Sequence, residues 1–377
     1  MKHVVVYRNP DFYITFPSVV ALSGNKIMIA FREAGSFSVR ASKAGSPTHH
    51  DSDSRCCVIT SNDGGESFAP ESKTVVTTIE YGVNDPALTV LNNGKLVLRT
   101  SVIEVRPSSE RSALKHQFLA HRPELKTISA VVGLTFQSSD NEGKTWSPVQ
   151  MIEVEGTNDR FVSREPIIEL EDGTLLLSVY RSVPTQVEKA YLIRSWDGGK
   201  TWKDVSLIAE DKRGDVSMFQ GTNFNETAIL NLGNGKLLSM IRGDSSYYTD
   251  GAYMPIGGIG ELSYAFSDNA GFSWSHPKPS GIWGQPGHLL KLNNGVILCT
   301  YGYRKTPYAV KACFSYDNGK TWDLDNIITI KENCPIWDMG YPMSCQREDG
   351  KIVTVYYWVD EQNNRYIEAA IWEGGKK

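Results

Sequence analysis

The stretch SYDNGKTW at residues 315–322 decides the fold, because close copies of it recur along the chain. Each copy holds a serine, an Asp or Asn, a glycine, a hydroxyl residue and an aromatic at fixed spacing. The Asp or Asn side chain can accept backbone N–H bonds within a turn, and the glycine takes a positive φ. The aromatic packs the turn onto its own sheet. The other copies are SNDGGESF at 61–68, SDNEGKTW at 139–146, SWDGGKTW at 195–202 and SDNAGFSW at 267–274.

Six hairpin-like segments alternate with these five turns. Each is a β-rich run, a glycine turn such as NNG or EDG, and a second β-rich run. They cover residues 16–31, 85–98, 165–180, 226–241, 285–301 and 341–357. Four-stranded units repeated roughly every 60 residues are typical of a β-propeller. We therefore predict an all-β fold, a six-bladed β-propeller of four-stranded antiparallel blades that forms one domain over residues 1–377. Strand-like ends at both termini would close the ring.

Composition and charge exclude several classes of protein. The net charge of −4 argues against a nucleic-acid partner, and there is no apolar run long enough to span a membrane. The N-terminus lacks the apolar segment of a signal peptide, so we expect a cytoplasmic protein. The six cysteines form no CxxC pair, so we expect no cysteine-based metal site. The sequence carries no signal for the oligomeric state.

The first residues of the six hairpins should converge at one mouth of the central channel. Inner strands begin there, and the channel mouth is the usual ligand site of such a fold. Charged groups in a shared, partly enclosed mouth are costly unless they pair or bind a ligand. The polar residues at or beside these positions are Asp85, Arg164, Glu165, Glu226, Gln285, His288 and Tyr341.

Arginines and a polar loop add to the predicted mouth. Arg32, Arg242 and Arg304 follow second strands, and arginine is suited to forked bonding with carboxylates. The loop SKAGSPTHHDSDSRC at 42–56 brings histidines and aspartates together, which suits proton transfer. Segment 101–130 is longer than a blade linker needs, so it would form a lid or an interface. The loop residues concerned are His49, His50, Asp51 and Asp53.

These residues and repeats resemble the sialidases and related bacterial neuraminidase repeat proteins, whose repeated turn is called the Asp box. The resemblance covers essentially the whole chain. It implies a nucleophile at Tyr341, a glutamate at Glu226 that polarises it, and arginines at Arg242 and Arg304 that bind a carboxylate. It also implies an acid/base aspartate on the 42–56 loop, where Asp51 or Asp53 fits. One position departs, because Thr15 stands where sialidases have the first arginine of a triad.

The resemblance implies a retaining exo-glycoside hydrolase that acts on a terminal acidic sugar, sialic acid or a related one, without a cofactor. Tyr341 would attack the anomeric carbon after Glu226 takes its proton. Arg32 or Arg164 would replace the missing triad arginine. Asp85 and Glu165 would bind hydroxyls or orient arginines. The further candidates for carbohydrate binding are His50, Gln285 and His288.

Two alternatives belong to other classes. A polysaccharide lyase would use His49, His50 or His288 with Tyr341 and Arg304 to remove the C5 proton of a uronate, and its unsaturated product would absorb in the ultraviolet. A glycan-binding propeller without turnover would not require a base beside Tyr341.

Overall fold

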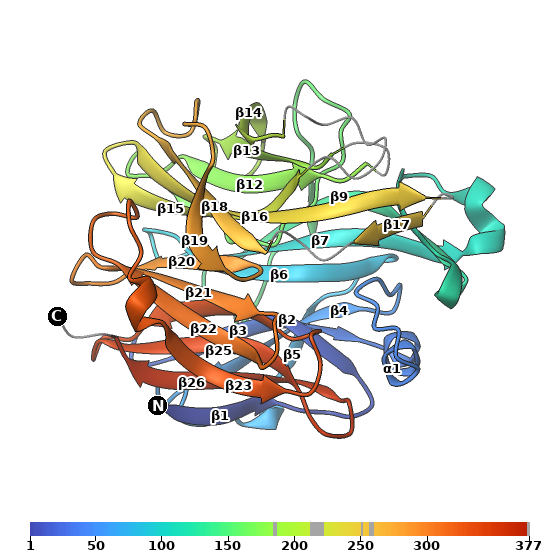
Figure 1. Ribbon diagram of the computed structural model, residues 1–377, viewed down its shortest axis with the longest axis horizontal. Coiled ribbons are helices and arrows are strands. Elements are labelled where there is room, and N and C mark those ends of the chain that lie inside the picture. Colours follow the sequence, from blue (N-terminus) through green and yellow to red (C-terminus); the bar gives the residue numbers. More distant parts are fainter. Residues whose placement is uncertain (184–186, 212–221, 250–251, 256–259, 375–377) are drawn as a thin grey trace.

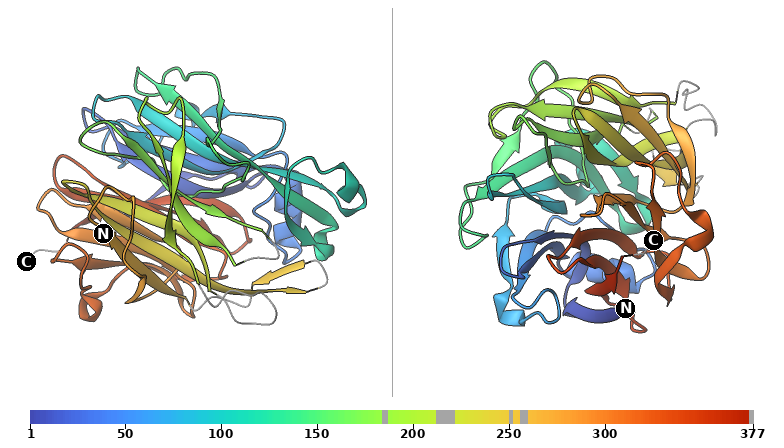
Figure 2. Two further views of the ribbon diagram at one scale, coloured as in Figure 1. Left: turned by 90° about the horizontal axis from the view of Figure 1, so that it is seen from above. Right: turned by 90° about the vertical axis from the view of Figure 1, so that its left-hand side faces the viewer.

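Six antiparallel sheets follow one another in the computed structural model, which describes residues 1–183, 187–211, 222–249, 252–255 and 260–374. They form the predicted six-bladed β-propeller, so this prediction is confirmed. In the right-hand view of Figure 2 the colours run around the ring from blue through green and orange to red. The N-terminal strand β1 (Lys2–Tyr7) pairs with the C-terminal strand β26 (Arg365–Glu373), which closes the ring as expected.

In each of the first three blades the strands follow one another in chain order from the first strand outward (Figure 1). Blade one contains β2 (Tyr13–Ala21), β3 (Ile27–Ala34), β4 (Arg55–Ser61) and β5 (Thr74–Thr77). Blade two contains β6 (Gly82–Val90), β7 (Leu96–Pro107), β9 (Thr127–Ser139) and β10 (Gln150–Ile152), with β8 (Gln117–Arg122) beside β9. Blade three contains β11 (Ile168–Glu169), β12 (Leu175–Arg181), β13 (Lys189–Ser195) and β14 (Lys203–Ala209).

The other three blades complete the ring. Blade four contains β15 (Thr222–Gly233), β16 (Lys236–Thr249), β18 (Glu261–Ser267) and β19 (Lys278–Trp283), with β17 (Ala252–Pro255) beside β16. Blade five contains β20 (Gly287–Lys291), β21 (Ile297–Tyr303), β22 (Tyr308–Ser315) and β23 (Ile328–Cys334). Blade six contains β24 (Gly340–Gln346), β25 (Lys351–Val359), β26 and β1.

Helices are short in the described part of the chain. The α-helix α1 (Ser36–Lys43) lies in the connection between β3 and β4 and ends at the start of the polar loop predicted at 42–56. The 3₁₀ helices are η1 (Pro70–Ser72), η2 (Ser108–Ala113), η3 (Pro123–Leu125) and η4 (Leu324–Asn326). No helix among the described residues is both long and apolar enough to cross a membrane.

The Asp-containing turns have the hydrogen bonds that their sequence predicts. In the turn at 195–202, Asp197 Oδ1 accepts from the backbone N–H of Thr201 at 2.9 Å. Ser195 Oγ accepts from the backbone N–H of Gly199 at 2.9 Å. Gly199 has φ +91°, which only glycine adopts readily. The indole N–H of Trp202 donates to the Gly199 carbonyl at 3.1 Å, and its ring is buried in the core.

A bulge interrupts the first strand of four blades just inside its start. The register shifts there, and the residue at the shift has a left-handed backbone although it is not glycine. These residues are Phe16 (φ 55°), Asp85 (φ 47°), Glu226 (φ 21°) and Tyr341 (φ 50°). Bulges re-aim a side chain, and strained non-glycine backbones cluster at functional sites. The bulge therefore explains why the positions aligned by sequence face the channel mouth.

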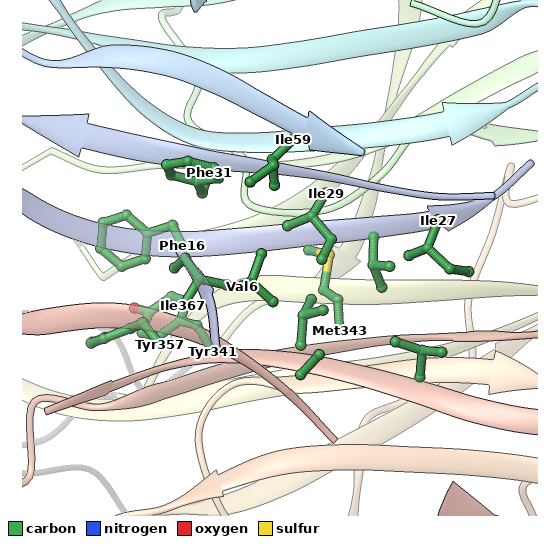
Figure 3. Close-up of a cluster of buried hydrophobic side chains, with 14 of the residues drawn as sticks. Val6, Phe16, Ile27, Ile29, Phe31, Ile59, Tyr341, Met343, Tyr357 and Ile367 are labelled. Atoms are coloured by element: carbon green, nitrogen blue, oxygen red, sulfur yellow. The ribbon is translucent and has the colours of Figure 1, made fainter. Parts of the chain in front are cut away.

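The packing between blades one and six reaches this mouth. Figure 3 shows apolar side chains of both blades in one buried cluster, with Phe16, Tyr341 and Tyr357 gathered at one end of it. Ile29 and Met343 lie farther along the same cluster. The ring of Tyr341 is thus part of the interblade core, and only its hydroxyl end is available for chemistry.

Trp202 provides a test of the turn's packing role. Its side chain is 1% exposed, whereas Trp196 in the same turn is 47% exposed. Trp202→Ala is expected to lower the free energy of unfolding by about 3–5 kcal/mol, because a large buried ring is lost. Trp196→Ala, the matched control, is expected to change it by less than about 0.5 kcal/mol. Urea unfolding followed by circular dichroism measures both, and equal losses would contradict this account.

Candidate active site

Tyr341, Glu226 and Arg242 form one hydrogen-bonded group at the channel mouth. The Tyr341 hydroxyl donates to Glu226 Oε1 at 2.8 Å. Arg242 Nη1 donates to the Tyr341 oxygen at 3.0 Å and also bonds Glu226 Oε2. Arg242 Nε lies 2.8 Å from Asp244 Oδ2, so a second carboxylate orients the guanidinium. The structure thus brings together three residues that the sequence placed on blades four and six.

Two further arginines lie against the Tyr341 ring. The guanidinium carbon of Arg164 is 5.2 Å from the ring centre, and that of Arg304 is 5.3 Å from it. Phe16 packs edge-on at 4.8 Å between ring centres. Cations over an aromatic face interact favourably with its electrons, and the more so where water is excluded. The ring is therefore fixed by aromatic and cationic neighbours.

The protonation states of this group follow from burial and charge. Burial, and then the Glu226 carboxylate, raise the pKa of Tyr341 well above its usual value. Burial alone would raise the pKa of Glu226, but the charges of Arg242 and Arg164 and two hydrogen bonds bring it below its usual value. Near neutral pH the phenol is protonated and the carboxylate is ionised. Tyr341 therefore needs a base to become a nucleophile, and Glu226 is bonded to its proton.

A cavity of about 640 Å³ opens above these side chains. The four bulge residues, Phe16, Asp85, Glu226 and Tyr341, all line it. Acidic, amide, basic and aromatic side chains all contribute to its lining. Other residues lining it include Asn84, Glu188, Asn225, Arg242, Asp244 and Gln285, and then His49, His50, Arg122, Trp283, Arg304, Lys305, Tyr308 and Trp337.

Two carboxyl groups in the cavity have strongly raised pKa values. Burial, and then the charge of Glu226, raise the pKa of Asp85 to about 7. Burial raises the pKa of Glu188 to about 7, although Asn225 donates to its carboxylate at 2.7 Å. Glu188 was not predicted from the sequence, because it follows a hairpin instead of starting one. Both carboxyls are partly protonated near neutral pH, which favours interaction with sugar hydroxyls.

Asp51 and Asp53 do not reach the cavity wall. Asp51 is buried, and its carboxylate accepts from the backbone N–H of Ser38 at 3.0 Å, from the Ser38 hydroxyl at 2.7 Å and from the backbone N–H of Asp53 at 3.0 Å. Asp53 is exposed beside Gly35. Asp51 thus satisfies the Ser38 N–H in the first turn of α1 and stabilises the loop that follows. The geometry gives neither aspartate the acid/base position that the resemblance implied.

Histidines of the same loop take the place expected for those aspartates. His49 and His50 both line the cavity. His49 Nε2 lies 2.9 Å from Asp338 Oδ1, and His50 Nδ1 lies 3.0 Å from the Ser129 hydroxyl. Asp338 was missed, although it stands three residues before Tyr341 in WDMGYP.

Several other predicted residues are buried and do not line the cavity. Arg164 is buried and donates to Glu165 at 2.8 Å, so these two neutralise each other. His288 is buried, and its pKa is lowered to about 3 by burial. Arg32 lies opposite Thr15 in the β2–β3 ladder and is fully buried. Within the described chain none of its guanidinium nitrogens has a hydrogen-bond partner, and it is not among the lining residues.

Gln285 and the long segment 101–130 do contribute to the cavity. Gln285 donates to Asp244 Oδ1 at 2.8 Å. Segment 101–130 extends β7 and β9 and forms β8, which places Leu119 and Arg122 in the wall. Strand β17 of blade four lies against β8, so extensions of two blades meet beside the mouth. Among the described residues, no group of three His, Cys, Asp or Glu could hold a metal ion.

Six blades, five Asp-containing turns and a tyrosine–carboxylate pair at the mouth define a sialidase-like β-propeller. The chain belongs to the BNR repeat-like domain family, whose model matches residues 116–354. A search of curated protein sequences finds no match.

Solved structures share the fold at low sequence identity. A Dyadobacter fermentans protein of unknown function is similar with a TM-score of 0.81 and 22% identity, over 99% of this chain and 98% of that chain. The NanB sialidase of Streptococcus pneumoniae is similar with a TM-score of 0.68 and 11% identity, over 98% of this chain and 70% of that chain. The intramolecular trans-sialidase of Ruminococcus gnavus is similar with a TM-score of 0.62 and 14% identity, over 96% of this chain and 94% of that chain. At these identities the likeness establishes the fold alone.

Asp85 provides a pH-dependent test of the cavity's electrostatics. Its pKa is about 7 in the fold, against about 3.9 in an unfolded chain. Between these values the native state holds a proton that the unfolded state has lost, so this group's contribution to stability falls as pH rises. Asp85→Asn removes that effect. The difference in urea midpoint, variant minus unaltered protein, is expected to be larger at pH 8 than at pH 4.5. An equal difference at the two pH values would contradict the raised pKa of Asp85.

Proposed function

We propose that this protein is a retaining exo-glycosidase that removes a terminal acidic sugar. The observation that carries the proposal is the 2.8 Å hydrogen bond from the Tyr341 hydroxyl to Glu226, both of which line the cavity. A tyrosine that is bonded to a proton acceptor and lines a sugar-sized cavity fits the glycosidases that use tyrosine in place of a second carboxylate.

The bond arrangement supports covalent catalysis by Tyr341. As its oxygen attacks the anomeric carbon, its proton passes to Glu226. Arg242 donates to the same oxygen at 3.0 Å, so it stabilises the negative charge that develops there. A neutral phenol also avoids the repulsion that a carboxylate nucleophile would meet from an anionic substrate.

Basic side chains support an acidic substrate. Arg304 lines the cavity and, within the described residues, donates only to the Met339 carbonyl, at 3.3 Å. Arg122 and Lys305 line the cavity as well. A carboxylate above Tyr341 would therefore find Arg304 and Arg242 on one side. Arg32 is fully buried and does not line the cavity, so Thr15 leaves the site without a direct replacement for the first arginine of the resembling family.

Aryl glycosides of sialic acid, related nonulosonic acids and uronic acids provide the test. The protein is expected to hydrolyse at least one of them with retention of configuration. Tyr341→Phe is expected to lower kcat/KM by about 10³-fold or more, because the nucleophile is lost. Glu226→Gln is expected to lower it by about 10²–10⁴-fold, because the proton acceptor is lost.

Tyr356→Phe is the matched control for Tyr341→Phe. Tyr356 is also buried and donates to a glutamate, Glu368, at 2.7 Å, but it does not line the cavity. This variant is expected to retain activity. Turnover that survives Tyr341→Phe unchanged, or no turnover of any substrate in the panel, would overturn the proposal.

A lyase acting on a uronate is the second candidate, and His49 favours it. Burial lowers the pKa of His49, although Asp338 opposes this, so the imidazole is neutral near pH 7 and can accept a proton. An unsaturated product with ultraviolet absorbance would identify elimination. Hydrolysis yields no such product.

A further inference from the structure

His49 is placed to exchange protons with a molecule in the cavity. It lines the cavity on the loop between β3 and β4, and its side chain is 27% exposed. Its ring packs edge-on against Phe16, with ring centres 4.9 Å apart, and its centre is 6.5 Å from that of Tyr341. The imidazole and the phenol can therefore act on the same sugar ring.

A buried carboxylate fixes the orientation of this imidazole. Asp338 is fully buried and accepts from Tyr13 at 2.6 Å, from Tyr357 at 2.9 Å and from Arg365 at 2.9 Å, besides bonding His49. Because Asp338 accepts these bonds as a carboxylate, we assign the Nε2 proton of His49 to this contact. Nδ1 of His49 then has no protein partner in the described parts of the chain and is available to the cavity.

The same network holds the loop that carries His49. Arg365 bonds Asp338 through one amino group and the Ser42 hydroxyl, at the end of α1, through another. Asn363 donates to the Ser42 carbonyl at 3.0 Å. An imidazole fixed in this way by a carboxylate and a rigid loop is typical of residues that transfer protons in catalysis.

Asp51 and Asp85 are less well placed than His49 to protonate the leaving group. The Asp51 carboxylate already accepts hydrogen bonds from the backbone N–H and the hydroxyl of Ser38 at the start of α1. Asp85 lines the cavity from the same kind of first-strand bulge as Tyr341. A leaving oxygen departs from the face of the anomeric carbon opposite the attacking Tyr341 oxygen, and so away from the bulge that carries Tyr341. His49 comes from a loop outside the inner strands.

We propose that His49, oriented by Asp338, is the acid/base residue of this site, an inference that rests on the proposed function. In the first step, the Tyr341 oxygen bonds the anomeric carbon and the bond to the leaving oxygen breaks. The leaving oxygen takes a proton from Nδ1 of the His49 imidazolium, and Glu226 takes the proton of Tyr341.

In the second step, water bonds the anomeric carbon and the bond to Tyr341 breaks. The water proton passes to His49 Nδ1, and Glu226 returns its proton to Tyr341. Glycoside and water become free sugar and alcohol, and every residue regains its starting state. A substrate carboxylate in the cavity favours the imidazolium, because opposite charge stabilises the charged form against burial and against the charges of Arg32 and Arg122.

Leaving-group dependence in His49→Gln tests this role. An alkyl or sugar leaving group needs protonation, so kcat/KM for such glycosides is expected to fall by about 10²-fold or more. An activated aryl leaving group departs without protonation, so kcat/KM for aryl glycosides should stay within about threefold of the value for the unaltered protein. For the same substrates kcat should fall, because the second step, attack by water, loses its base and becomes slow. Azide attacks without a base, so it should restore kcat and yield the glycosyl azide.

Asp338→Asn acts through His49, so it is expected to show the same selectivity, with a smaller loss. His3→Gln is the matched control, because His3 lies 3.2 Å from the buried carboxylate of Glu368 far from the cavity lining. It should behave as the unaltered protein. Equal losses for all leaving groups in His49→Gln, absence of azide rescue, or this signature in Asp85→Asn instead, would overturn the inference.

The outcome for the proposed function is separate. If the unaltered protein hydrolyses aryl glycosides through Tyr341 but His49→Gln shows no selectivity, only this inference fails. If Tyr341→Phe leaves hydrolysis unchanged, or the product is unsaturated, the proposed function fails and the acid/base role of His49 falls with it.

Discussion

A left-handed residue interrupts the first strand of four of the six blades, and proline follows it in three of them. Proline has no N–H to offer the ladder, so the break in pairing at this point leaves no donor unsatisfied. The break turns the side chains of Phe16, Asp85, Glu226 and Tyr341 toward one cavity. In a regular strand, successive side chains point alternately to the two faces of the blade. The site therefore depends on a backbone conformation that costs stability and that the ring of blades maintains.

Charge compensation determines which of these side chains can react. Glu226 is kept ionised by Arg242 and Arg164, while burial keeps Tyr341 protonated. One group is a ready acceptor and the other a donor, and they are already bonded to each other. At Asp85, burial and the charge of Glu226 outweigh the nearby arginines, so its pKa is raised to about 7. Environments that separate the pKa values of neighbouring groups are how a single site performs acid and base chemistry.

Much of the fold could be predicted, because each turn and hairpin is encoded locally and repeated. The repeats also aligned Tyr341 with Glu226 and Asp85, which the bulges explain. The loop between β3 and β4 could not be predicted, because its shape depends on Asp51 bonding Ser38 and on Arg365 reaching Ser42 from the last blade. Glu188 and Asp338 were missed for the same reason. Their importance comes from partners far away in sequence, and no local pattern records those partners.

Covalent labelling tests the central claim about Tyr341 most directly. A fluorinated glycosyl fluoride of the acidic sugar that the protein hydrolyses would form the glycosyl-enzyme and slow its breakdown. Peptide mass spectrometry should then locate the added sugar on Tyr341, and Tyr341→Phe should remain unlabelled. An adduct on Asp85, Glu188 or Glu226, or hydrolysis without any adduct and with inversion of configuration, would contradict a tyrosine nucleophile.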